Sequence, residues 1–103
     1  MKIEIYYFDH CPSYRQTVDN LREVLKEENI QADLCLIRVT SPENAAEVNF
    51  MGSPTIKIDG IDLDGLEGPA SFNCRLYRID GRLTGVPTKS FIREKIKMPK
   101  IAG

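Results

Sequence analysis

The hydrophobic pattern of this chain alternates between strand-like and helix-like segments, and this order constrains the fold more than any other feature. An apolar run over residues 2–8 is typical of a buried strand, and residues 12–28 carry apolar side chains at the spacing of an amphipathic helix. A second continuous apolar run, from Ala32 to Val39, is typical of a parallel strand covered on both faces. This order predicts an α/β fold.

The later segments complete the predicted element order. Thr40 and Glu43 have capping-box spacing, so a second helix is expected to start near residue 41 and to end before Gly52. Asp59-Gly60 is a strong hairpin signal, which places residues 56–58 antiparallel to residues 61–63. An irregular loop, a strand, a turn and a closing helix are expected over residues 64–73, 74–79, 80–81 and 88–97, respectively.

Length and charge limit the classes of protein to consider. The 103 residues, 42% of them hydrophobic, suit a single domain with one core over residues 1–103. The 14 Lys and Arg nearly cancel the 15 Asp and Glu, so bulk charge favours neither nucleic acid nor a membrane surface as a partner. The sequence shows neither a signal peptide nor a membrane-spanning run, so we expect a cytoplasmic protein whose cysteines are kept reduced.

Cys11 is the strongest candidate for a reactive residue. It lies between the first predicted strand and the first predicted helix, at a helix N-terminus. Free backbone N–H groups and the helix dipole favour an anion there, and the pKa of a thiol in such a position can be lowered. Cys35, inside the second apolar run, is expected to be a buried structural residue.

Two motifs at defined points of the element order resemble the thioredoxin superfamily. Cys11-Pro12-Ser13-Tyr14 stands where thioredoxins and glutaredoxins have a C-x-x-C motif, and Ser53-Pro54-Thr55 stands where they have a cis-proline. More narrowly, the chain is similar to small thioredoxin-like proteins named DF family (seleno)proteins, which share the opening at residues 7–12 and the segment 74–77. The resemblance implies a thioredoxin-like fold with a central mixed sheet (βαβα-ββ-α), an extra loop and hairpin before the last helix, and a cis peptide bond before Pro54.

One departure from the family motif decides the expected chemistry. Tyr14 replaces the second cysteine, so a disulfide within the motif is excluded, and the mechanism needs a single cysteine or a resolving thiol elsewhere. Cys74 is the candidate resolving thiol, because the hairpin at Asp59-Gly60 returns the chain to the Cys11 edge of the sheet. The alternative is that Cys74 only fills the core at a strand start.

Residues beside the two motifs are further candidates, each with a simpler alternative. The imidazole of His10 could lower the thiol pKa or return a proton, or it could be an exposed loop side chain. Ser13 could donate to the thiolate, and Ser53 could offer backbone groups to an extended substrate, although both suit turns. Pro12 and Pro54 are further candidates for substrate binding. Tyr14 either packs on the first helix or covers the sulfur.

Charged residues give weaker signals. Five basic side chains in the last third of the chain could together bind an anionic ligand such as the carboxylates of glutathione, but basic side chains on strands and helices are more often solvated. The members of this basic group are Arg75, Arg78, Arg82, Lys89 and Arg93. The aspartates at positions 59, 62 and 64 lack the register of a calcium loop and are expected to form turns.

The sequence therefore leads to three functional hypotheses. In the first, the protein is a thiol-disulfide oxidoreductase without a bound cofactor, in which the Cys11 thiolate reacts with a disulfide-bearing protein or a small thiol compound. Cys74 or a small thiol, with glutathione as a candidate co-substrate, then resolves the product. In the second, Cys11 and Cys74 bind a soft metal ion, Cu(I) or Hg(II). In the third, the chain is a non-catalytic interaction module.

Overall fold

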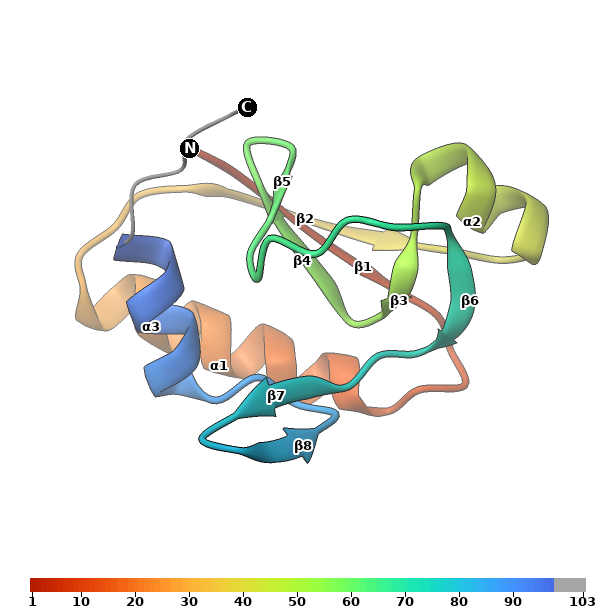
Figure 1. The fold of residues 1–103 in the computed structure, drawn as a ribbon. Coiled ribbons are helices and arrows are strands. Elements are labelled where there is room, and N and C mark those ends of the chain that lie inside the picture. The colour runs from red at the N-terminus through yellow and green to blue at the C-terminus, as the bar shows by residue number, and fades with distance from the viewer. Residues whose placement is uncertain (98–103) are drawn as a thin grey trace.

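A mixed four-stranded sheet forms the centre of the structure, a computed structural model that describes residues 1–97 (Figure 1). The strands lie in the order β2-β1-β4-β5, and they span Asp33–Arg38, Lys2–Tyr7, Thr55–Ile58 and Ile61–Asp62, respectively. β1 runs parallel to β2 and antiparallel to β4. The turn at Asp59-Gly60 joins β4 to β5 as an antiparallel hairpin, as predicted. The α/β class is confirmed by this mixed sheet and its helices.

Two small sheets accompany the central one. β3 (Met51–Ser53) pairs in parallel with β6 (Ser71–Cys74), and β7 (Tyr77–Ile79) forms a hairpin with β8 (Arg82–Thr84). The β7–β8 hairpin is the predicted extra hairpin. The β3–β6 pair was not predicted, and the strand expected over residues 74–79 is interrupted after β6, because strands of three or four residues show too little periodicity to be recognised.

Three helices are present in residues 1–97: α1 (Ser13–Glu27), α2 (Pro42–Val48) and α3 (Lys89–Lys97). The cap of α2 lies one residue later than predicted, since the Asn44 N–H donates to Ser41 Oγ at 3.0 Å. Pro42 occupies the first helical position, so the extended residue before it becomes the cap. No helix within residues 1–97 has both the length and the apolar character needed to cross a bilayer.

The core has one part on each face of β1. Ile3 and Ile5 pack in a cluster with side chains of α1 and α3, whereas Tyr6 and Phe8 pack with residues around α2. This division follows from the alternation of side chains along a strand. Figure 1 shows α1 and α3 side by side, with α2 at the opposite end of the sheet. Cys11 belongs to the cluster around α2, so the candidate nucleophile is part of the core.

The second strand is less covered than its composition predicted. β2 is at the edge of the sheet, and all of its residues are exposed or half-buried. Leu36 is 45% exposed, and Cys35 is exposed. The prediction of a strand covered on both faces, with Cys35 buried, is therefore wrong. An edge strand has a neighbouring strand on one side only, and the helices cover the centre of the sheet more fully than its edge.

Candidate functional site

Cys11 lies between β1 and α1, where the sequence placed it, but its side chain is buried. The residue is 3% exposed and packs with Phe8 and Phe50. Its backbone N–H donates to the Phe8 carbonyl at 3.2 Å, which closes a turn between the strand and the helix. Its Sγ donates to the Ser53 carbonyl oxygen at 3.4 Å. The thiol is thus held against β3 by a backbone acceptor.

Cys74 comes to the same place from the other side of the β3–β6 pair. It is the last residue of β6 and is paired in register with Ser53, whose carbonyl binds Cys11. A hydrogen bond with Cys11 raises the pKa of the Cys74 thiol, with smaller contributions from desolvation and from negative charge on Cys11. Both cysteines are free thiols. The structure therefore brings together an exposed thiol and a buried thiol that lie 63 positions apart in the sequence.

The Ser53–Pro54 peptide bond is cis, as the family resemblance implied. Ser53 is fully buried, and its Oγ accepts a hydrogen bond from the Phe8 N–H at 3.3 Å. Its carbonyl also accepts the Arg75 N–H at 2.9 Å. This carbonyl therefore accepts two hydrogen bonds from within the chain, one from Cys11 Sγ and one from the segment that leaves β6.

The other predicted site residues have different surroundings. His10 is exposed, and its ring meets Phe8 edge-on with the centroids 6.0 Å apart. The Tyr14 ring stacks on Tyr7 with the centroids 4.2 Å apart, which agrees with a packing role. Ser13 Oγ would lie 3.0 Å from a Cβ atom added at Gly85, so this hydroxyl faces the segment after β8. Pro12, the exposed N-cap of α1, makes no side-chain cap hydrogen bond.

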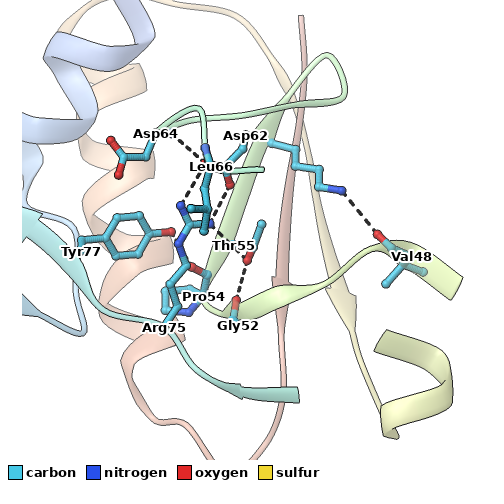
Figure 2. Close-up of polar contacts among 10 residues, drawn as sticks. Val48, Gly52, Pro54, Thr55, Asp62, Asp64, Leu66, Arg75 and Tyr77 are labelled. Carbon is cyan, nitrogen blue, oxygen red and sulfur yellow. Dashed lines mark hydrogen bonds and ion pairs between the residues drawn. The ribbon is translucent and has the colours of Figure 1, made fainter. Parts of the chain in front are cut away.

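A buried ion pair next to Cys74 was missed by the sequence analysis. Arg75 Nη1 and Nη2 contact the carboxylate oxygens of Asp62 at 2.6 and 2.9 Å, and both side chains are 4% exposed (Figure 2). Asp62 forms a turn, as expected, because its Oδ2 accepts the Asp64 N–H at 3.0 Å and its carbonyl accepts the Gly65 N–H at 3.0 Å. The expectation that Arg75 is a solvated cation is wrong. No local pattern could have revealed the pair, because its members lie on different strand segments and meet only in the folded chain.

Two other members of the basic group, Lys89 and Arg93, are paired with carboxylates. Lys89 and Arg93 on α3 contact Glu27 at the end of α1, at 2.7 and 2.6 Å. These ion pairs tie the two helices together at an exposed position, where such contacts contribute little individually. Within residues 1–97, no group of three or more His, Cys, Asp or Glu side chains is placed to hold a metal ion. A soft metal would have the two thiols as its ligands.

The site thus consists of Cys11, Cys74 and the Ser53-Pro54 turn between them. A buried thiol that contacts an exposed one can be oxidised with it to a disulfide or can share a thiophilic ion with it. No protein-family model, curated protein or solved structure matches the chain.

Proposed function

We propose that this protein is a thiol-disulfide oxidoreductase whose redox centre is the Cys11–Cys74 pair. The observation that supports it is that Cys74 is paired in register with Ser53, whose carbonyl accepts the Cys11 thiol, so an exposed and a buried thiol adjoin the same residue. A disulfide requires a short Cβ separation, and the pairing of β6 with β3 brings Cys74 toward Cys11. The pair takes the place of the C-x-x-C motif that Tyr14 interrupts.

We further propose that the fold is thioredoxin-like. In support, β1, α1, β2, α2 and the β4–β5 hairpin follow the expected order, and the cis-proline adjoins the cysteine at the start of α1. Such a protein would be cytoplasmic, and the pair would rest there as a dithiol.

The reaction proceeds by two exchanges. The raised pKa of Cys74 keeps a proton on that thiol. The Cys11 thiolate attacks one sulfur of a substrate disulfide, and the other substrate sulfur leaves as a thiolate that takes up a proton. Cys74 then loses its proton and attacks Cys11 Sγ, which releases the second substrate thiol. The substrate disulfide is reduced to two thiols, and the protein dithiol is oxidised to a disulfide.

Access to Cys11 favours a small substrate. Because Cys11 is 3% exposed and Cys74 is exposed, a substrate reaches the buried sulfur by passing Cys74. A narrow disulfide such as oxidised glutathione, or an extended segment of a disulfide-bearing protein, fits this approach better than a broad protein surface.

The test is equilibration of the protein with mixtures of reduced and oxidised glutathione, followed by acid quenching, thiol labelling and peptide mass spectrometry. We expect Cys11 and Cys74 to become protected together through one intramolecular disulfide. Cys35→Ser is the matched control and should behave like the wild type, because Cys35 is the exposed cysteine on β2. In Cys74→Ser, a mixed disulfide with glutathione should accumulate on Cys11. Failure of the wild-type pair to oxidise would overturn the proposal.

Soft-metal binding is the second candidate, and the position of both thiols beside Ser53 favours it. Two thiolates suit Cu(I), which prefers soft sulfur ligands. Titration of the reduced protein with Cu(I) against a competing chelator should show one ion per chain, with binding lost in Cys11→Ser and in Cys74→Ser. Binding that survives both substitutions would exclude this site.

A further inference from the structure

The segment that joins β6 to β7 has an unusual distribution of side chains. Arg75, directly after Cys74, is 6% exposed, whereas Leu76 is 59% exposed. Arginine is almost never fully buried unless it is paired, and a leucine in the same segment would normally take the buried position. The inward orientation of Arg75 therefore has to be explained by its contacts.

Arg75 is held to the structure through its backbone and its side chain. Its N–H donates to the Ser53 carbonyl at 2.9 Å, and its Cβ lies so near β3 that a Cβ on Gly52 would come within 2.7 Å. Its guanidinium binds Asp62 with two parallel hydrogen bonds and lies over the Tyr77 ring, 4.5 Å from the centroid. Such a bidentate pair fixes orientation as well as position.

The partners of Arg75 are fixed independently of it. Asp62 Oδ2 accepts the backbone N–H groups of Asp64 and Leu66, each at 3.0 Å, so the carboxylate is held at the end of the β4–β5 hairpin. The Tyr77 hydroxyl donates to the Pro54 carbonyl at 2.5 Å. Figure 2 shows these side chains around the turn that contains the cis-proline. The residue after Cys74 is thus bound to the β4–β5 hairpin and, through its backbone, to the turn that contacts Cys11.

We propose that Arg75 and Asp62 are positioning residues of the redox pair, which hold Cys74 against Cys11 and thereby set the equilibrium of the disulfide. This inference rests on the proposed function. Cys74 is exposed at the end of a four-residue strand, and the ion pair begins at the next residue. Preorganisation of two groups raises the equilibrium constant for joining them, since less freedom is lost when the bond forms.

The experiment measures the glutathione redox equilibrium of the Cys11–Cys74 pair in wild type, Arg75→Lys and Asp62→Asn. Arg75→Lys keeps the positive charge and removes the bidentate geometry. It therefore tests whether the orientation of the ion pair matters, with the smaller risk of unfolding. Asp62→Asn keeps the shape of the carboxylate and removes its charge. Ile92→Val is the control, because Ile92 is fully buried on α3 and lies outside this network. Urea unfolding of every reduced variant records stability separately.

We expect each network variant to lower the equilibrium constant for disulfide formation by about tenfold, equivalent to ~30 mV for a two-electron couple. Ile92→Val should leave this constant within about twofold of wild type, although it also lowers stability. An unchanged constant in folded Arg75→Lys would overturn the positioning role and leave the proposed function intact. Failure of the wild-type pair to form the disulfide would instead refute the proposed function itself. If Asp62→Asn does not fold, the redox equilibrium of Arg75→Lys alone tests the positioning role.

Discussion

Replacement of Gly52 by alanine tests the close approach of β3 and β6, on which the geometry of the site depends. Gly52 has a φ of +106°, a backbone conformation that residues with a Cβ rarely adopt. A Cβ at this position would lie 2.7 Å from Arg75 Cβ and 3.2 Å from Arg75 Cα. The second contact is with backbone, so a side-chain rotation cannot relieve it.

Two costs add up in Gly52→Ala. The positive φ costs an L-residue about 1–2 kcal/mol, and the overlap with Arg75 forces a shift that typically costs about 1–3 kcal/mol. Gly60 is the matched control: it has a φ of +86°, and within residues 1–97 no heavy atom beyond Gly60 and its two chain neighbours would lie within 4 Å of its added Cβ. Gly60→Ala should therefore show the conformational cost alone, about 1–2 kcal/mol.

The assay is urea unfolding of the reduced proteins, followed by circular dichroism and analysed by linear extrapolation. We expect Gly52→Ala to lose about 1–3 kcal/mol more of the free energy of unfolding than Gly60→Ala does. Equal losses would refute the reasoning, because they would mean that Arg75, directly after β6, does not approach β3 at Gly52. Gly81→Ala, at the turn of the β7–β8 hairpin, is a second control with a φ of +77° and an open Cβ position.

Three further substitutions test other parts of the structure. Burial raises the pKa of Tyr77 above its usual 10.0. The free energy of unfolding should therefore fall as pH rises above about 10, where the unfolded chain releases this proton and the folded chain keeps it. In Tyr77→Phe, urea unfolding at alkaline pH should show a smaller fall. At neutral pH, the same variant should lose about 1–3 kcal/mol, because the Pro54 carbonyl loses its donor. Ser41→Ala should cost about 1 kcal/mol in urea unfolding through loss of the α2 cap, and no loss would contradict the cap. Cys35→Ser should change stability by less than about 0.5 kcal/mol, whereas a larger loss would mean that Cys35 is buried.

Local signals predicted much of the fold. The apolar run of β1, the amphipathic pattern of α1 and the Asp59-Gly60 turn each depend on residues that are neighbours in the sequence, and each element formed close to its predicted bounds. The closing helix was predicted over residues 88–97 and begins at Lys89. Its packing through Phe91, Ile92 and Ile96 follows from their spacing on one helix face.

Features that depend on the order of strands in the sheet could not be predicted in the same way. The apolar composition of β2 suits a central strand, yet β2 lies at the edge, and Cys35 is exposed as a result. The β3–β6 pair joins segments about 20 residues apart, neither of which is long enough to show a strand period. This pairing brings the Arg75 N–H to the Ser53 carbonyl, a contact that no local pattern predicts.

The sequence by itself determined which residues carry chemistry: a cysteine where the first strand meets the first helix, a proline at the mouth of a later strand, and Cys74 as the candidate second thiol. Only the tertiary structure decided that Cys11 is buried, that Cys74 contacts it, and that the Arg75–Asp62 pair anchors the residue after Cys74. The physical reason is that reactivity at a helix end depends on local backbone groups. Burial and ion pairing depend instead on which distant segments of the chain meet, and the packing of the whole core determines those meetings.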